Sequence, residues 1–225
     1  MTLLNRKALE GLVQLMVALM LLIFLPAWTL NYWQAWVFLS VFFVAVLAVT
    51  LYLMRHDPAL LERRVRAGPG AEKETRQKII QSIASMVFIS VFVFSALDFR
   101  FHRSTVSFQL SLVGDVLVAL GLYIVFLVFK ENSFTSATIE TTPEQKVVTT
   151  GPYAVVRHPM YSGAFVMLVG VPLALGSVWG LLTIAPLMLI IIWRLCDEER
   201  FLAKNLDGYV DYKNKTRYRL IPFFW

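Results

Sequence analysis

The sequence places a cation, an imidazole and a phenol close together in the run Arg157-His158-Pro159-Met160-Tyr161. Proline suits the first turn of a helix, where its missing N–H would have had no partner, so we expect a helix to begin at Pro159. Such a helix start favours an anionic ligand group. Arg157 and His158 precede Tyr161 by four and three residues, a spacing at which side chains converge. The same spacing also fits a snorkelling arginine, a capping histidine and an interfacial tyrosine at the end of a membrane span.

A second polar cluster follows about 40 residues later, where Glu198 and Glu199 stand side by side. Glu198 could pair with Arg194 in an ordinary i, i+4 surface ion pair. Tyr209 and Tyr212 come next and would share one face of a short helix, which equally fits an amphipathic helix at a membrane surface. Taken together, the two clusters predict a polar, aromatic pocket that could hold a charged soluble cofactor beside a lipid-borne substrate.

The chain that must position these residues is strongly apolar. It has 225 residues, of which 58% are hydrophobic and 16% charged, whereas globular proteins carry about 25% charged residues. This composition excludes disorder and argues against an ordinary soluble enzyme. Crossing a bilayer takes about 20 apolar residues, and four uncharged runs approach or exceed that length: 11–54, 79–97, 116–129 and 159–193. We therefore expect an all-α, polytopic bundle of membrane helices.

About six spans account for these runs. The run 11–54 would extend about 66 Å as one helix, roughly twice the hydrocarbon core, so it must fold back near Pro26. The expected helices before residue 131 are 8–27, 32–54, 78–97 and 108–129. The run 159–193 predicts a compact C-terminal hairpin of two helices, and one long tilted helix is the rival interpretation. The chain thus divides into an N-terminal membrane region, 1–130, and a C-terminal region, 131–225.

The basic residues indicate how the spans are oriented. In the six-span arrangement 19 of the 21 basic residues lie on one side, and Arg100 and Arg103 are the two exceptions. The positive-inside rule makes that side cytoplasmic, with both termini there, whereas five spans would put the basic C-terminus outside. The hairpin then brings His158 and Glu199 together at the inner leaflet. The basic linker from Leu53 to Lys78 is interpreted as a cytoplasmic loop near anionic headgroups.

Several classes of partner are not expected. The net charge of +6 is explained by topology, so the basic residues do not indicate nucleic-acid binding. Cys196 is the single cysteine, and with three scattered histidines it predicts neither a disulfide nor a metal site. Asp115 interrupts the fourth expected span near its start and is interpreted as an interfacial residue at its outer end. A transporter would instead place ionisable groups near the midplane.

The motifs resemble a known family of membrane enzymes. The run GPYAVVRHPMYSG at 151–163, the glutamate pair and the closing Arg219-Leu220-Ile221-Pro222 are similar to the isoprenylcysteine carboxyl methyltransferases, including bacterial members. The resemblance covers roughly residues 132–222. It implies an integral membrane methyltransferase of a bacterial inner membrane that uses S-adenosylmethionine, held in a pocket at the cytosolic surface, and acts on a lipophilic or lipidated acceptor.

The resemblance also implies roles for individual residues. The implied catalytic residues are Arg157, Glu198, Glu199 and Arg219. The implied cofactor-binding residues are Tyr153, His158, Tyr161, Glu199, Tyr209 and Tyr212. Arg157, or amide donors near His158, would hold the cofactor's carboxylate, and Glu198 or Glu199 its amino or ribose groups.

The identity of the acceptor is open at this stage. An isoprenylcysteine-like carboxylate is one candidate, and it would need no general base because it is already ionised. Methylation of a phospholipid or another lipid on nitrogen or oxygen is the alternative, in which glutamate or histidine could assist deprotonation of an amine. A membrane transporter or a lipid-binding protein without catalytic activity is the alternative outside the enzymes. It would leave the cluster of Arg157, His158 and the two glutamates unexplained.

Overall fold

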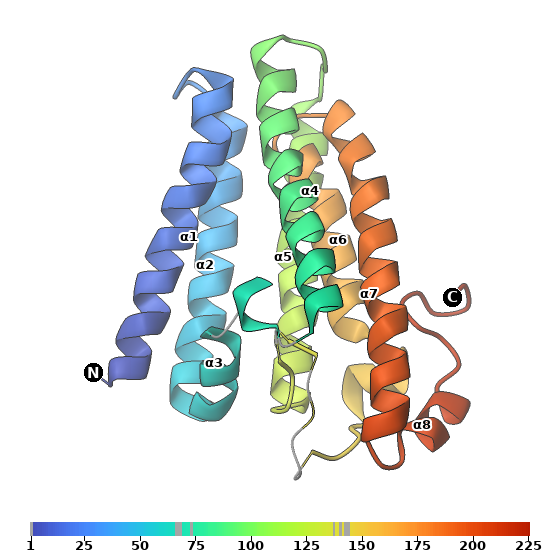
Figure 1. Cartoon of the computed structure of the whole chain (residues 1–225). Helices are drawn as coiled ribbons and strands as arrows, with labels where there is room; N and C mark the ends of the chain where they lie inside the picture. Colours follow the sequence, from blue (N-terminus) through green and yellow to red (C-terminus); the bar gives the residue numbers. More distant parts are fainter. Residues whose placement is uncertain (1, 66–68, 73, 137, 140, 142–144) are drawn as a thin grey trace.

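The computed structural model describes residues 2–65, 69–72, 74–136, 138–139, 141 and 145–225, and within these residues it contains helices and no strand (Figure 1). The long helices are α1 (Leu3–Ala27), α2 (Trp33–His56), α4 (Thr75–Arg100), α5 (Phe108–Glu131), α6 (Pro159–Ala174) and α7 (Ile184–Asn205). The shorter elements are α3 (Pro58–Val65), η1 (Pro69–Ala71), η2 (Gly151–Ala154), η3 (Trp179–Thr183) and α8 (Tyr209–Lys215).

The helices have the lengths of membrane spans. Within the described residues, five are long and apolar enough to cross a bilayer, namely α1, α2, α4, α5 and the continuous run from Trp179 to Asn205. The apolar helix α6 is shorter, with 16 residues. The expected all-α polytopic bundle is therefore confirmed, with α6 as the short member of the six expected helices.

The chain reverses direction where the sequence predicts it. Helix α1 ends at Ala27, the capping residue Trp28 adopts a left-handed φ of 58°, and α2 begins at Trp33. The C-terminal hairpin is also present, because α6 ends at Ala174 and Gly176 turns the chain with a φ of 71°. Figure 1 shows α6 and α7 running side by side in opposite directions. Helix α7 continues beyond Trp193 and carries Glu198 and Glu199 on its last turns.

Helices α5 and α6 pack with their backbones in contact. A Cβ atom on Gly121 would lie 2.5 Å from the carbonyl oxygen of Gly163, and one on Gly114 would lie 2.2 Å from the backbone nitrogen of Ala174. Small residues allow helices in membranes to approach this closely. The close packing fixes the start of α6 beside the end of α5. Asp115 of α5, near the start of this helix, is 5% exposed and is thus buried among the helices.

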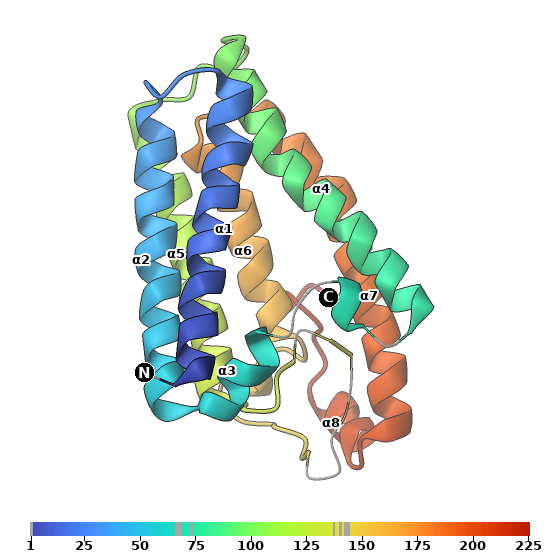
Figure 2. The ribbon, with the colours of Figure 1, turned by 60° about the vertical axis from the view of Figure 1, so that its left-hand side comes forward.

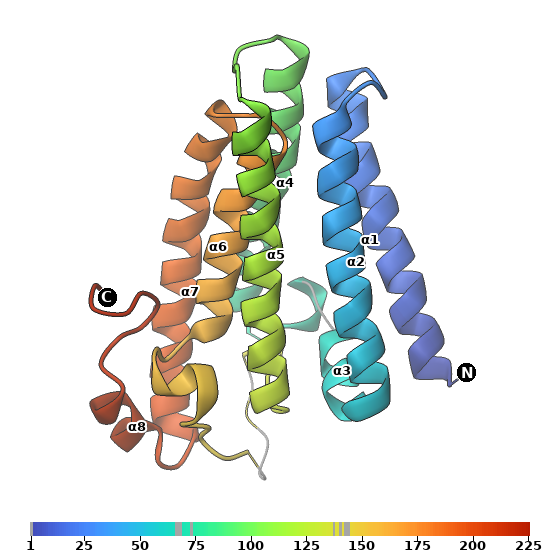
Figure 3. The same cartoon turned by 180° about the vertical axis from the view of Figure 1, so that it is seen from behind.

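The two ends of the bundle differ. At one end Asp98 of α4 accepts hydrogen bonds from Ser104 Oγ at 2.6 Å and Ser177 Oγ at 2.5 Å, which ties the α4–α5 connection to the α6–η3 turn. At the other end lie α3, α8 and the first residues of α1 (Figures 1 and 3). Figure 2 shows α4 diverging from α1 toward this second end, together with α7. The Arg157-His158-Pro159 run and the Glu198-Glu199 pair both lie toward the second end.

Candidate functional site

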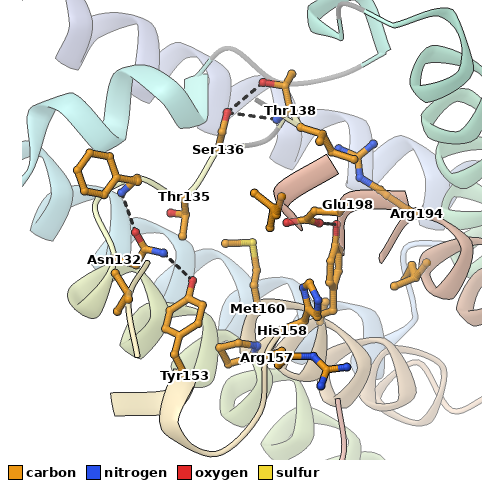
Figure 4. Close-up of a pocket in the computed structure, with 18 of the residues that line it drawn as sticks. Asn132, Thr135, Ser136, Thr138, Tyr153, Arg157, His158, Met160, Arg194 and Glu198 are labelled. Atoms are coloured by element: carbon orange, nitrogen blue, oxygen red, sulfur yellow. Dashed lines mark hydrogen bonds between the residues drawn. The ribbon is translucent and has the colours of Figure 1, made fainter. Parts of the chain in front are cut away.

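A cavity of about 510 Å³ lies where α6 begins and α7 ends (Figure 4). Its polar wall comes from the segment after α5, from η2, from the start of α6 and from α8. Its apolar wall comes from α4, α6 and α7, with side chains such as Phe88, Met167, Leu187 and Ile191. Seven of the sequence-predicted site residues line it: Tyr153, Arg157, His158, Tyr161, Glu198, Tyr209 and Tyr212. Glu199 and Arg219 lie outside the wall formed by the described residues.

Glu199 is the centre of a buried ion cluster. Its Oε1 atom accepts a hydrogen bond from Arg157 Nε at 2.7 Å and lies 3.3 Å from His158 Nε2. Its Oε2 atom accepts a hydrogen bond from Arg219 Nε at 3.1 Å. The side chains of Arg157 and Glu199 are only 6% and 4% exposed. The predicted juxtaposition of the start of α6 and the end of α7 is therefore present in the structure.

The C-terminal tail lies along the start of α6. The backbone N–H of Arg157 donates to the carbonyl oxygen of Tyr218 at 2.9 Å, and that of His158 donates to Arg219 O at 3.0 Å. Arg157 Nη1 also donates to Thr216 O at 2.9 Å. The amides of Arg157 and His158 are thus used to hold the tail, so the amide donors near His158 that could hold a ligand's carboxylate do not include these two. A hydrogen bond already made within the protein leaves these amides unavailable to a ligand.

The two glutamates of α7 face different surroundings. Glu198 lines the cavity and accepts a hydrogen bond from Tyr161 Oη at 2.7 Å, whereas Glu199 points into the ion cluster. Successive helical residues are about 100° apart around the axis, which explains the separation. Arg194, a possible i, i+4 partner of Glu198, bonds Glu72 at 2.6 Å and Gln77 at 3.1 Å. It thereby ties α7 to the start of α4.

The tyrosines form the wall of the cavity next to α8. Tyr212 Oη donates to Tyr153 O at 2.8 Å, and the Tyr153 hydroxyl accepts a hydrogen bond from Asn132 Nδ2 at 3.0 Å. Burial raises the pKa of Tyr153 and of Tyr209 well above the ordinary value, and it raises the pKa of Tyr212 to about 12. All three phenols are therefore neutral near pH 7 and act as hydrogen-bond donors or acceptors rather than as bases.

Three buried polar atoms of the cavity wall have no hydrogen-bond partner among the described residues. They are Gln81 Oε1, Thr135 Oγ1 and Tyr209 Oη. Because a buried polar group without a partner costs free energy, such atoms indicate where a polar ligand would bind. They come from α4, from the segment after α5 and from α8, so they surround the cavity on three sides.

Sequence reasoning missed two parts of this wall. Arg63 and Arg64 of α3 donate to the carbonyl oxygens of Ser133 at 2.5 Å and Ser136 at 3.1 Å. Arg64 lines the cavity, whereas Arg63 does not. The basic linker therefore contributes a cavity-lining arginine that its interpretation as a loop near headgroups did not predict. Gln81 and Phe88 of α4 were also missed, because an apolar span gives no signal of which face lines a cavity.

Comparison with known families agrees with this geometry. Residues 110–207 match the family of phospholipid methyltransferases, which belongs to the isoprenylcysteine carboxyl methyltransferase-like superfamily of membrane methyltransferases. The matched region is similar to this family of membrane methyltransferases. It runs from α5 to the end of α7 and includes both glutamates and the Arg157-His158 pair. No curated protein matches the chain. The resemblance expected from the motifs is confirmed, and it supports methyl transfer to lipid-like substrates by an integral membrane protein.

Proposed function

We propose that the protein transfers a methyl group from S-adenosylmethionine to the headgroup of a membrane lipid. One observation carries the proposal: in a membrane methyltransferase, a single cavity joins a polar wall of tyrosines, Glu198 and His158 to an apolar wall from α4, α6 and α7. The polar wall suits a soluble cofactor and the apolar wall suits a lipid chain. The cofactor roles of Tyr153, His158, Tyr161, Tyr209 and Tyr212 are part of this proposal.

The chemistry of the wall fits this cofactor. The cavity volume of about 510 Å³ lies within the range of roughly 300–1,000 Å³ that is usual for small-molecule sites. The unpartnered Tyr209 hydroxyl and Thr135 hydroxyl would bond polar atoms of the ligand, and the Glu198 carboxylate would attract its ammonium group. Tyrosine faces attract cations such as a sulfonium. When bound, S-adenosylmethionine supplies an activated methyl group.

The chain's own residues would act mainly by alignment. Displacement at a methyl carbon requires the nucleophile and leaving group to be held in line in a site that excludes water. Among the described residues of the wall, Glu198 is the carboxylate that would take a proton from an amine acceptor if it does not hold the cofactor's ammonium group. Glu199 is better placed as a positioning residue, since it orients Arg157 and His158 from outside the wall. The role of Arg219 would be the same, through its bond to Glu199.

The family match favours a phospholipid amine as the acceptor, because phospholipid methylation gives that family its name. The carboxylate of an isoprenylcysteine-like lipid is the second candidate, supported by the Arg157-His158-Pro159 motif. The cavity lies at the end of the bundle that carries 19 of the 21 basic residues in the six-span arrangement. The positive-inside rule supports a cytoplasmic cavity with both termini on that side, as in a bacterial inner membrane.

Methyl-labelled S-adenosylmethionine tests the proposal. The purified protein in nanodiscs is incubated with this donor and a total lipid extract, and label is expected in the organic phase. Alkali then separates the two candidates, because a methyl ester releases labelled methanol and an N-methyl group does not. The Glu198→Gln variant, which removes the negative charge from the wall, should transfer less label. Label found in protein, or none transferred, would contradict lipid methylation.

A further inference from the structure

We infer that Arg64 of α3 binds an anionic group of the methyl acceptor, either a phosphate or a carboxylate. This anionic group either lies next to the methylated group or is itself the methylated group. The inference rests on the proposed function and names the class of lipid that the site selects. Acceptors with a neutral headgroup would be poor substrates.

The surroundings of Arg64 carry the inference. Its guanidinium lines the cavity, with Nη1 donating to Ser136 O at 3.1 Å and lying 3.9 Å from Met160 Sδ. Its Cζ atom lies 4.9 Å from the centre of the Phe129 ring. Its contacts with the described residues are thus a carbonyl oxygen, a thioether and an aromatic face, and they include no carboxylate.

The other arginines of the cavity wall are neutralised within the protein. Arg157 is paired with Glu199 at 2.7 Å and Arg194 with Glu72 at 2.6 Å. Lys146 also lines the cavity but is exposed to solvent. Among the described residues, Arg64 is therefore a partly buried cation without a carboxylate partner, whose charge a ligand could neutralise. A guanidinium binds phosphate or carboxylate oxygens through two parallel hydrogen bonds.

The electrostatics of the site support an anionic ligand there. Burial lowers the pKa of the Arg64 guanidinium from its ordinary value, an effect that the nearby Tyr161 and Tyr153 phenols partly offset. Arginine nevertheless stays protonated at physiological pH. Partial burial makes a cation without a counter-charge less well solvated than one in bulk water, so an anion bound beside Arg64 would gain a stronger interaction than at an exposed site.

The position of Arg64 favours the acceptor over the cofactor. Leu60 and Leu61 of α3 belong to one buried apolar cluster with Phe129, and Met160 packs against this cluster. Of the proposed cofactor tyrosines, Tyr153 and Tyr161 lie near Arg64, whereas Tyr209 and Tyr212 belong to α8. Figures 1 and 3 show α3 and α8 on opposite sides of this end of the bundle. Arg64 also lies outside the matched region 110–207. A group that reads the acceptor need not belong to the part of the chain shared with other methyltransferases.

The matched control is Arg63, which also donates to a carbonyl of the segment after α5 but does not line the cavity. In Arg64→Gln we expect the KM for the acceptor to rise about tenfold or more, as for loss of a charged hydrogen bond. The affinity for S-adenosylhomocysteine should stay within about twofold, since a group that contacts only the acceptor adds nothing to cofactor binding. Arg64→Lys should recover part of the loss, and Arg63→Gln should resemble the wild type. Equal losses in Arg63→Gln and Arg64→Gln, or weakened S-adenosylhomocysteine binding in Arg64→Gln, would overturn the inference.

A binding experiment separates this inference from the proposed function. The melting temperature of the protein in detergent is measured with dioleoyl phosphatidic acid, with oleate and with neutral dioleoylglycerol. We expect one of the two anions to stabilise the wild type and Arg63→Gln more than the neutral lipid does, and this difference to disappear in Arg64→Gln. Phosphatidic acid as the active probe indicates a phosphate ligand, and oleate a carboxylate. If neither anion is preferred by the wild type, Arg64 is not an anion receptor, even if methyl transfer is observed. Anion preference without methyl transfer would contradict the proposed function alone.

Discussion

Glu199 and Arg157, which are 42 positions apart in the sequence, form a buried ion pair with a distance of 2.7 Å between Oε1 and Nε. The pair joins the last turns of α7 to Arg157, two positions before the start of α6. Since Arg157 also donates to Thr216 O and Arg219 also bonds Glu199, the pair holds the C-terminal tail against the hairpin. The cavity wall therefore depends on a carboxylate that does not itself line the cavity.

Replacing Glu199 with glutamine should destabilise the protein. The change keeps the side-chain shape but leaves Arg157 buried without its counter-charge, a loss of about 3–5 kcal/mol for a broken buried pair. Glu198→Gln is the matched control, because Glu198 is partly exposed and accepts a hydrogen bond from the Tyr161 hydroxyl rather than pairing with a buried arginine such as Arg157. The melting temperature in detergent should fall by several degrees for Glu199→Gln and much less for Glu198→Gln. Equal melting temperatures would show that the ion cluster does not stabilise the fold.

The hydropathy pattern predicted the membrane helices well because the bilayer imposes a minimum length on each span. The expected span 108–129 compares with α5 at Phe108–Glu131, and the start of α6 at Pro159 was also predicted. Tertiary contacts were harder to predict. The tail occupies the amides of Arg157 and His158, and nothing in the spacing of the motif indicates that a segment 60 residues later would bind there.

The position of Arg64 in the cavity wall illustrates the same limit. A run of basic residues between two apolar spans is the ordinary signature of cytoplasmic topology. Whether one of its arginines faces lipid or a cavity depends on where α3 packs, and Leu60 and Leu61 contribute to this packing as members of a buried cluster that includes Leu53 and Phe129. A pair of leucines in an eight-residue helix is too common a pattern to predict that contact.

The tyrosines of α8 allow binding and stability to be separated. Tyr209 Oη is buried beside the cavity without a partner among the described residues, so Tyr209→Phe removes no hydrogen bond within that part of the protein. We expect unchanged stability and an affinity for S-adenosylhomocysteine that is lower by about fivefold or more, the loss of a typical hydrogen bond. Tyr212→Phe loses the bond to Tyr153 O and should lower the melting temperature. Calorimetric affinity that is unchanged in Tyr209→Phe would remove this hydroxyl from the cofactor site.

The raised pKa of Tyr212 leads to a prediction of how the stability of the protein depends on pH. Burial raises its pKa from 10.0 to about 12, so the folded protein holds the phenolic proton more tightly than the unfolded chain does. The stability contributed by this group is fully present below pH 10 and is lost as the pH rises from 10 to 12. The melting temperature of the wild type should therefore fall more steeply across this window than that of Tyr212→Phe. Parallel curves for the two proteins would contradict the assignment of this titration to Tyr212.

The contact between α5 and α6 should be intolerant of even one added methyl group. A Cβ on Gly121 would lie 2.5 Å from the carbonyl oxygen of Gly163 and the same distance from the backbone nitrogen of Met167, and backbone atoms cannot move aside without separating the helices. Gly11 of α1 is the matched control, because a Cβ there meets nothing within 4 Å. Alanine is favoured over glycine in a helix by about 1 kcal/mol, so Gly11→Ala should be neutral or slightly stabilising. Gly121→Ala should instead lower the melting temperature.

The same substitution should also weaken ligand binding, because α6 carries His158 and Tyr161 into the cavity from its start. A shift of about 1 Å is enough to impair a precisely aligned site, so S-adenosylhomocysteine affinity should fall in Gly121→Ala and stay constant in Gly11→Ala. Calorimetry in detergent measures both. A Gly121→Ala protein with wild-type melting temperature and affinity would mean that α5 and α6 do not pack backbone to backbone, and that something other than this contact positions the start of α6.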